Sequence, residues 1–469
     1  GEHRRELRVL PPLRQRRERA RRRPEPRNWV ARHRADETVA PMALAEYGHV
    51  PPAVSIGQSP GKGRGLFAGR DLRAGEVIFT ELPLVGMQHL GNAERVEACA
   101  MCMRHVGELE AQLARLVFDD DSARALIPRA MPLRELAFRA CPPPYRCRGG
   151  CGLAFCGAAC EARAWGEWHC LLCAPCSDGA GGAMSDEAAP SADPARVARL
   201  DAFRAHALET NEIFLLAARV CATALLSTGR LGSWDAAWAP FAAFTQPPWW
   251  EAVAFSAEDC AAGGEHAARE QMREVLAESW ALLRAALCDG HDAAASVALP
   301  VFADPQLYAQ IVGMFERNNC SMLVASPVED YFLHIDAMPD GHAKRAAEAV
   351  SGPVLDALGE DYALPAEGAG IFWLQAVLNH ACVPNVSFVK RDEDVDGRVV
   401  LTAARDIRAG EELVHSYIDE GKPLEERARE LRNYGFECTC QLCTAERGAA
   451  AGGSVGVGTG ERRGGRKLK

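Results

Sequence analysis

The sequence predicts an α+β fold in which one β-rich domain is divided by two insertions. Short apolar runs separated by glycine-rich turns, which are typical of strands, fill residues 53–85 and return at residues 368–418. Between them lie a cysteine- and glycine-rich segment at residues 99–176 and a block at residues 197–350 with apolar residues at helical spacing. We therefore expect a split β-rich domain that carries a metal-stapled module and a helical block.

The first β-rich part contains three segments that are typical of strands: VSI, GLFAG and EVIFTELPLV. The second contains four more: GIFWLQAV, NVSFVKR, GRVVLTAARDI and EELVHSYI. Helical spacing predicts helices over residues 201–227, 268–288, 304–318 and 423–435. Residues 177–196 have the composition of a low-complexity linker.

Length and charge limit the possible functions. The chain has 469 residues, enough for two or three domains, and a net charge of -10 that argues against polyanion binding by the protein as a whole. No apolar run reaches the roughly 18–20 residues that cross a bilayer, and no secretory signal is visible. We expect no membrane partner.

Both ends of the chain are basic. Residues 1–34 hold thirteen Arg and four Glu, and we interpret residues 1–50 as a disordered leader. A transit peptide, a nuclear-targeting or RNA-contacting tail, and untranslated sequence ahead of Met42 all remain open, so nucleic acid as a partner is undecided. Residues 446–469 are expected to be a disordered tail.

Four residue pairs in the cysteine-rich segment have the spacing of metal ligands. The pairs are Cys99 and Cys102, Cys147 and Cys151, Cys156 and Cys160, and His169 and Cys173. Eight soft donors make two closed tetrahedral zinc sites, and zinc would supply the stability that a segment with few core residues lacks. Cys141, Cys170 and Cys176 are left over, and Cys170 is an alternative to Cys173.

A third cluster, Cys438, Cys440 and Cys443, is one ligand short of a tetrahedral site. Cys382 is the natural fourth ligand, and free structural cysteines are the alternative. Cys382 belongs to the crowded stretch NHACVPN at residues 379–385. A satisfied buried histidine, a core cysteine and a Pro-Asn turn would also explain that stretch.

Together these motifs resemble the SET and MYND family of protein-lysine methyltransferases. GKGRGLFAG at 61–69 resembles the first SET motif, NHACVPN the NHSCxPN motif, GEELVHSYID at 410–419 the GEEL…SY motif, and FECTCQLC at 436–443 the post-SET CxCxxC motif. The eight-ligand segment is similar to a MYND zinc finger inserted into a SET domain. The short C-terminus, GIFWLQAVLNHACVPN and YAQIVGM resemble the branch of SET and MYND domain-containing protein 5, although a basic tail replaces that branch's acidic one.

The resemblance implies a domain order, which runs as follows: residues 53–97, first half of the SET domain; 98–176, MYND-type zinc finger; 177–196, linker; 197–365, helical SET insert; 366–420, SET core; and 421–445, post-SET segment. It also implies three zinc ions.

The resemblance further implies S-adenosylmethionine as the methyl donor. The backbone of Lys62, Gly63, Arg64 and Gly65 would wrap the amino-acid end of this cofactor, unless the stretch is an ordinary turn. Asn379 and His380 would hydrogen-bond its polar groups, and Phe436 would stack near its adenine. Asn318 matches a cofactor-contacting asparagine, but Asn319 or a helix-capping role fits equally.

Tyr417 is the catalytic residue that the resemblance implies. Its phenol would touch the cofactor, line the lysine channel and orient the ε-amine for in-line displacement. Tyr434 would form part of the channel wall. Either tyrosine, like Phe436, could instead be a structural aromatic residue.

Two positions depart from the family pattern. Ala381 replaces a serine, and this small change is expected to preserve activity. Cys320 stands where several members carry a channel-lining Phe, so we expect a wider channel and a changed number of transferred methyl groups.

The expected function is methylation of lysines in histones or other proteins, by a monomer in the nucleus, the cytoplasm or both. An acidic enzyme suits basic substrates such as histone tails and ribosomal proteins. The rival function is a zinc-dependent adaptor whose MYND finger binds Pro-containing peptides while the SET region is silent. The intact Asn379, His380, Tyr417 and cysteine set favours the enzyme.

Overall fold

The computed structural model describes residues 48–117, 121–130, 141–175, 193–253, 255, 263–288, 300–391 and 393–452. Predictions for the leader before residue 48, for most of the linker at 177–196, for Cys176 and for the tail after residue 452 lie outside these residues. Two of the predicted boundaries are wrong within them. Helix α7 already begins at Pro194, and helix α18 continues to Gly452 because its Ala-rich sequence favours helix.

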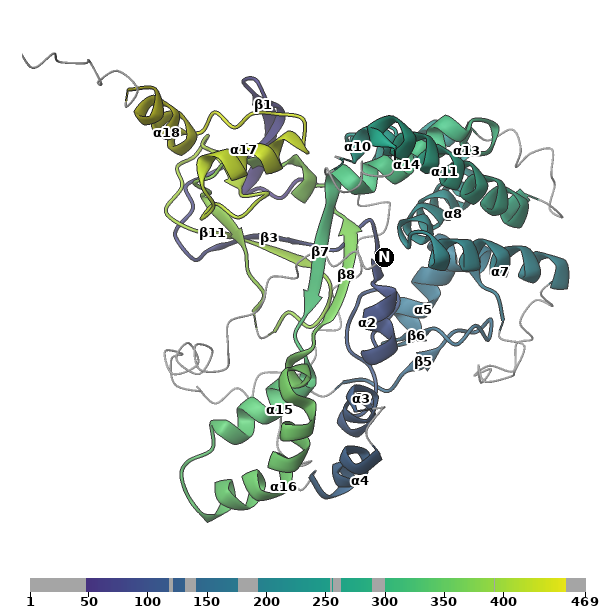
Figure 1. Cartoon of the computed structure of the whole chain (residues 1–469), viewed down its shortest axis with the longest axis vertical. Coiled ribbons are helices and arrows are strands. Elements are labelled where there is room, and N and C mark those ends of the chain that lie inside the picture. The colour runs from purple at the N-terminus through teal and green to yellow at the C-terminus, as the bar shows by residue number, and fades with distance from the viewer. Residues whose placement is uncertain are drawn as a thin grey trace, which may run out of the picture. The chain divides into compact units, whose positions relative to one another are not determined.

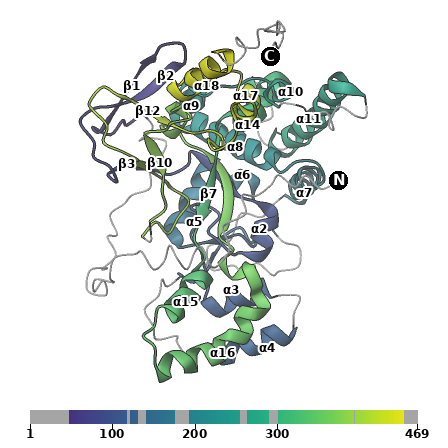
Figure 2. The ribbon, with the colours of Figure 1, turned by 60° about the vertical axis from the view of Figure 1, so that its left-hand side comes forward.

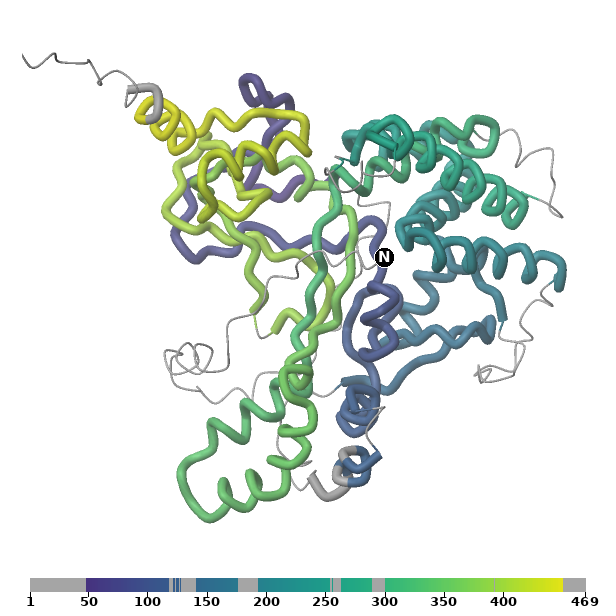
Figure 3. The backbone as a smooth tube through the Cα atoms, in the orientation of Figure 1, coloured from purple at the N-terminus to yellow at the C-terminus, as the bar shows by residue number. Residues whose placement is uncertain are grey.

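Three sheets combine strands from before and after the insertions, so the two β-rich segments form one unit. Figure 3 shows the N-terminal strands running among the C-terminal ones. The sheet orders are β1-β2-β12-β9, β10-β11-β3 and β4-β8-β7, and β5 and β6 form a separate hairpin in the cysteine-rich module, residues 98–175. The strands are β1 (Val54–Ser59), β2 (Gly63–Ala68), β3 (Val77–Glu81), β4 (Val85–Gln88), β5 (Tyr145–Arg146), β6 (Ala154–Phe155), β7 (Asn319–Val324), β8 (Ala366–Ile371), β9 (Asn379–His380), β10 (Val386–Phe388), β11 (Val399–Ala403) and β12 (Glu412–His415).

Helices make up most of the remaining described chain (Figure 1). They are α2 (Leu90–Arg95), α3 (Leu109–Leu116), α4 (Asp121–Ala130), α5 (Ala158–Ala164), α6 (Cys170–Leu172), α7 (Pro194–Glu209), α8 (Ile213–Leu231), α9 (Trp234–Ala242), α10 (Trp249–Ala252), α11 (Gly264–Cys288), α13 (Pro300–Ala303), α14 (Pro305–Asn318), α15 (Pro327–Asp336), α16 (His342–Leu358), α17 (Leu424–Arg432) and α18 (Gln441–Gly452). A π-helix at Trp165–His169 and 3-10 helices at Gly359–Ala363 and Gln375–Val377 complete the set.

The largest core lies among α7, α8, α11 and α14, where Phe214, Tyr308 and Phe315 are fully buried. Helix α8 is long and apolar enough to cross a membrane by length and composition. It is not an uninterrupted apolar run in the sequence, because it contains Arg219 and Arg230. Of its apolar window, 61% is buried inside the protein. Helix α8 is therefore a core helix of this fold.

A second helical core joins segments far apart in sequence. Helices α3 and α4 from the cysteine-rich module pack with α15 and α16 around residues such as Leu113, Tyr331 and Val354 (Figures 1 and 2). Ser326 caps α15 by accepting the backbone N–H groups of Val328 and Glu329, at 3.2 and 3.4 Å.

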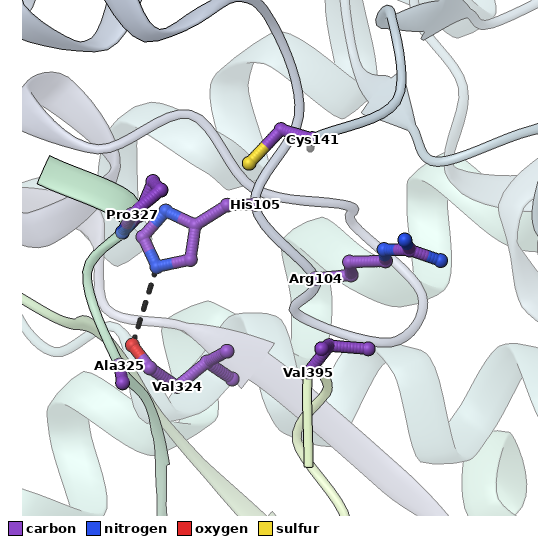
Figure 4. A pocket seen from close by; sticks show the side chains of 7 residues that line it. All are labelled: Arg104, His105, Cys141, Val324, Ala325, Pro327 and Val395. Carbon is purple, nitrogen blue, oxygen red and sulfur yellow. Dashed lines mark hydrogen bonds between the residues drawn. The ribbon is translucent and has the colours of Figure 1, made fainter. Parts of the chain in front are cut away.

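The cysteine-rich module is tied to β7 at a small cavity. His105 Nε2 donates to the carbonyl oxygen of Val324 at 3.2 Å, as Figure 4 shows. The loop between β10 and β11, whose Val395 lines the same cavity, also contacts the module: the backbone N–H of Gly397 donates to the carbonyl oxygen of Cys102 at 2.7 Å. The module therefore packs directly on two of the sheets.

Three element predictions are wrong in part. The predicted strand at 370–377 ends at Ile371, and Gln375–Val377 is a 3-10 helix. The predicted helix at 201–227 is two helices, because α7 ends at Glu209 and α8 begins at Ile213. The block at 197–350 is not wholly helical, since β7 lies within it and pairs with β8.

Candidate functional site

Residues 379–385, called the crossing below, lie against strand β12. Strand β9 pairs in parallel with β12, so that Asn379 lies opposite Val414 and His380 opposite His415. The side chain of Asn385, which is only 1% exposed, fixes this crossing. Its Oδ1 accepts the backbone N–H of Val414 at 2.8 Å, and its Nδ2 donates to the carbonyl oxygen of Glu412 at 2.8 Å. Asn385 is therefore a structural residue of the crossing.

A buried carboxylate positions the segment that leads into this crossing. Glu81, at the end of β3, accepts the backbone N–H groups of Leu374 and Gln375 at 2.9 and 3.0 Å. These groups open the 3-10 helix Gln375–Val377, so Glu81 acts as its N-terminal cap. Burial raises the pKa of Glu81 to about 7. The sequence analysis misses Glu81, because only the fold brings it to this helix.

Asn379 joins the glycine-rich turn to β12. Its Nδ2 donates to the carbonyl oxygen of Arg64 at 2.9 Å and to Glu412 Oε1 at 2.8 Å, and Lys62 Nζ lies 3.4 Å from Glu412 Oε2. A Cβ on Gly65 would lie 2.9 Å from Glu412 Oε1 and 3.1 Å from Asn379 Nδ2. Only glycine leaves room for this network. The sequence analysis assigns no role to Glu412, which is part of the GEEL motif.

Asn318 reaches the same region by an indirect route. Its Nδ2 donates to the carbonyl oxygens of Thr245 and Met314 at 2.9 and 2.8 Å, and the Arg64 guanidinium donates to the carbonyl oxygen of Ala243. The short segment 243–245 thus links Asn318 to the glycine-rich turn that carries Lys62, Gly63, Arg64 and Gly65. Asn319 begins β7 and is exposed.

Tyr417 lies directly after β12, against the crossing. Its hydroxyl donates to the carbonyl oxygen of Leu378 at 2.6 Å, and its backbone N–H donates to His380 Nδ1 at 3.1 Å. Burial raises the pKa of the Tyr417 hydroxyl and lowers the pKa of His380 to about 4. Both side chains are therefore neutral near pH 7, and the phenol keeps its proton.

Aromatic rings surround Tyr417. The centroid of its ring lies 5.1 Å from that of Tyr434, 6.2 Å from Phe436 and 4.8 Å from His415. Tyr434 and Phe436 are 39% and 36% exposed, whereas Tyr417 and His415 are half-buried. Exposed aromatic faces beside a buried polar network provide a surface for an apolar or cationic ligand group.

Ala381 and Cys320, the two residues that depart from the family pattern, lie in the crossing and in β7. Ala381 is buried, and its backbone N–H donates to the carbonyl oxygen of His415 at 3.0 Å, an interaction that needs no side chain. Cys320 lies in β7 opposite Gly370 of β8, and burial raises the pKa of its thiol to about 11. Its effect on the lysine channel stays a prediction.

Two groups in the cysteine-rich module could each hold a metal ion, and their ligands alternate along the chain. One combines Cys99, Cys102, Cys156 and Cys160, and the other Cys147, Cys151, His169 and Cys173. Within each group the ligand atoms lie within 4.8 Å of one another, and the Cys156 and Cys160 sulfurs are 3.4 Å apart. Tetrahedral zinc with Zn–S bonds of about 2.3 Å needs sulfurs roughly 3.8 Å apart, so both groups fit zinc. Cys170 lies outside them.

The third group consists of Cys382, Cys438, Cys440 and Cys443. The Cys382 sulfur lies 3.5 Å from that of Cys443 and 3.9 Å from that of Cys438, which also fits zinc. His380 Nε2 lies 3.3 Å from the Cys382 sulfur. One histidine therefore contacts both the metal-binding group and the backbone of Tyr417.

Comparison with known proteins identifies the family. A SET domain model matches residues 63–418. The chain is 33% identical to the histone-lysine N-methyltransferase ATXR2 of Arabidopsis thaliana, over 81% of this chain and 88% of that protein. It is 29% identical to the human protein-lysine N-trimethyltransferase SMYD5, over 83% of this chain and 85% of that protein. The chain belongs to the SET-domain family and is a protein-lysine methyltransferase of the SET/SMYD type.

Proposed function

We propose that this chain methylates lysine side chains of histones or other basic proteins, with Tyr417 at the reacting amine and S-adenosylmethionine held between the glycine-rich turn and the 379–385 crossing. One observation carries the proposal: Asn379 ties the turn at Arg64 to Glu412, while the Tyr417 hydroxyl is bound to Leu378, the residue next to Asn379. The candidate cofactor contacts and the candidate catalytic phenol therefore share one rigid crossing.

S-adenosylmethionine would supply an electrophilic methyl group on a sulfonium. Lys62, Gly63, Arg64 and Gly65 would bind its amino-acid end with backbone groups, Asn379, His380 and Asn318 would contact its polar atoms, and Phe436 would lie near its adenine. Because Gly65 has no side chain, a ligand can approach the backbone closely there.

Tyr417 would position the lysine amine. Its hydroxyl hydrogen is committed to the Leu378 carbonyl, which leaves the oxygen lone pairs to accept an N–H of the substrate amine. The raised pKa keeps this phenol protonated, so no phenolate is available as a base. The lysine proton would leave to water, and Tyr417 would orient the neutral amine. Tyr434, beside it, would form the apolar channel wall that excludes other water.

Three zinc ions would bind to the three groups of cysteine and histidine ligands. We assign two to a MYND-type finger and one to a post-SET site, which would hold Tyr434 and Phe436 close to Tyr417. The names of the relatives refer to histone-lysine and protein-lysine substrates, and the net charge of -10 suits basic partners of either kind.

The first test is methyl transfer from labelled S-adenosylmethionine to histones and to whole-cell protein. Tyr417→Phe should lower the rate at least about tenfold, because the phenol oxygen positions the amine. Tyr308→Phe is the matched control, since the Tyr308 hydroxyl also makes a buried hydrogen bond, at 2.8 Å to Ser279, but lies in the helical core.

A Tyr417→Phe variant as active as the parent would remove the role assigned to this hydroxyl. Calorimetric titration with S-adenosylmethionine separates the enzyme from the rival adaptor that binds Pro-containing peptides. A folded, zinc-loaded sample that binds no cofactor would favour the adaptor.

A further inference from the structure

A cavity of about 460 Å³ lies between the cysteine-rich module and helices α2, α7 and α8, and none of the residues assigned to methyl transfer lines it. One face of α7 lines it with Leu200, Phe203 and Leu208, which recur at helical spacing. Leu215 and Ala218 of α8 line it too. A cavity of this size and apolar lining is in the range of small-molecule sites.

The charged groups in the cavity wall are mostly positive. Four arginines line it, Arg115, Arg146, Arg204 and Arg219, against one carboxylate, Glu97. Glu97 pairs with Arg146 at 2.7 Å and with Arg115 at 3.2 Å, so one acid serves two guanidinium groups. Arg204 reaches Asp201 at 3.6 Å. The balance leaves the cavity electropositive.

Arg219 is the arginine without a carboxylate partner in the described part of the chain. Its Nη1 donates to the carbonyl oxygens of Gly86 and Ala100, and its guanidinium lies 3.9 Å from the centre of the Trp168 ring. Burial lowers the pKa of Arg219 to about 9, yet its side chain is not closed off, because it lines the cavity. A deep cation that retains accessible donors favours an anion.

A buried polar atom of a lining residue, His169 Nδ1, lacks an acceptor among the described residues. His169 Nε2 faces the Cys147 and Cys151 sulfurs at 3.1 and 3.3 Å, so the proton of the neutral ring belongs on Nδ1. His169 is 1% exposed, and its Nδ1 has no hydrogen-bond partner among the described residues. A metal-binding histidine nearly always donates this N–H to an oxygen.

We propose that this cavity is a binding site for a small amphiphile with one anionic head group, carboxylate or phosphate, on an apolar body. The head group would pair with Arg219 near Trp168, and the apolar body would lie along Leu200, Phe203 and Leu215. Trp168 belongs to the cysteine-rich module and Arg219 to α8, so the ligand would bridge the module and the helical block. This proposal does not rest on the proposed methyl transfer.

Titration of the full-length, zinc-loaded protein with decanoate, decyl phosphate and decanol tests it, with tryptophan fluorescence and calorimetry as readouts. We expect saturable one-to-one binding of at least one anion and binding of decanol about tenfold weaker or more. The two anions distinguish the head groups. Absence of saturable anion binding, or equal binding of decanol, would overturn the proposal.

Two variants locate the site. Arg219→Gln should weaken binding of the anion about tenfold and leave decanol unchanged, and Arg273→Gln is the matched control because Arg273 also stacks on a tryptophan, Trp250, at 4.7 Å outside the cavity. If Arg219→Gln does not fold, Ala93→Leu narrows the cavity from its partly exposed wall and should weaken binding of both the anion and decanol. Undiminished binding to a folded Ala93→Leu variant would place the ligand elsewhere and contradict the proposal.

Discussion

Glu412 holds together parts of the candidate site that are far apart in sequence. One carboxylate oxygen accepts a hydrogen bond from Asn379 and the other forms an ion pair with Lys62. The next residue, Leu413, lies opposite Leu66 of β2. Asn379 and Lys62 belong to motifs that are recognisable in the sequence, but a motif does not tell which acid closes the network. The pairing of β2 with β12, which are far apart in the sequence, brings Glu412 to this position.

Gly65 offers a direct test of this network. In Gly65→Ala the new methyl group would lie 2.9 Å from Glu412 Oε1, so the carboxylate or Asn379 must move. We expect affinity for S-adenosylmethionine, measured by calorimetry, to fall about tenfold, a change of about 1.4 kcal/mol. Gly91→Ala is the control, since nothing lies within 4 Å of that Cβ. Unchanged affinity in Gly65→Ala would show that the network does not shape the cofactor site.

Glu81 should make stability depend on pH. Its pKa is raised from 4.5 to about 7 in the folded protein, so between these values the folded state binds the proton more tightly than the unfolded chain. The free energy of unfolding must then fall as pH rises through this window, by roughly 3 kcal/mol in total.

Glu81→Gln removes this titration. It also removes one hydrogen-bond acceptor, which should lower the free energy of unfolding by about 1 kcal/mol. Urea unfolding of both proteins from pH 5 to 8 gives the test, because other titrating groups cancel in the difference between them. The stability difference between parent and variant should shrink or reverse towards pH 8. A constant difference would contradict the assignment.

Two of the elements that were predicted wrongly, the strand at 370–377 and the helical block around β7, depend on distant contacts. The run GIFWLQAV is mostly apolar and has no period that separates strand from helix. The carboxylate of Glu81, from β3, instead caps the 3-10 helix Gln375–Val377 that follows the strand. Strand β7 follows a strong helix without a break, and only its pairing with β8 makes it extended. By contrast, most residues of the three groups that could hold a metal ion can be predicted from sequence, because they occur as closely spaced pairs.

The alternating ligand pairs make the two groups of the module interdependent. Cys156→Ser removes a ligand from the group that also contains Cys99 and Cys102, and the segment of the other group lies between these pairs. We expect bound zinc, measured by mass spectrometry of the metal, to fall by at least one ion per chain. Cys170→Ser is the control, since Cys170 neighbours His169 but lies outside both groups. Equal zinc content in the two variants would contradict the ligand assignment.

The fold connects its three metal-binding groups to the candidate site in different ways. The two groups of the cysteine-rich module contact the β-rich unit through backbone hydrogen bonds such as that from Gly397 to Cys102. Neither group contains a residue of the crossing. The third group includes Cys382, two residues after His380 in the crossing itself, and its other ligands follow Tyr434 and Phe436 directly. Loss of a metal ion should therefore have a different effect at each place.

Two matched ligand variants test this difference. Cys443→Ser should lower affinity for S-adenosylmethionine at least about tenfold, because the freed segment no longer holds Phe436 and Tyr434 beside Tyr417. Cys147→Ser removes an equally buried ligand and should lower the thermal midpoint, while cofactor affinity of the folded fraction changes less than about threefold. Calorimetric titration and zinc analysis of both variants give the comparison. If Cys147→Ser weakens cofactor binding as much as Cys443→Ser, the cysteine-rich module supports the cofactor site as directly as the C-terminal group does.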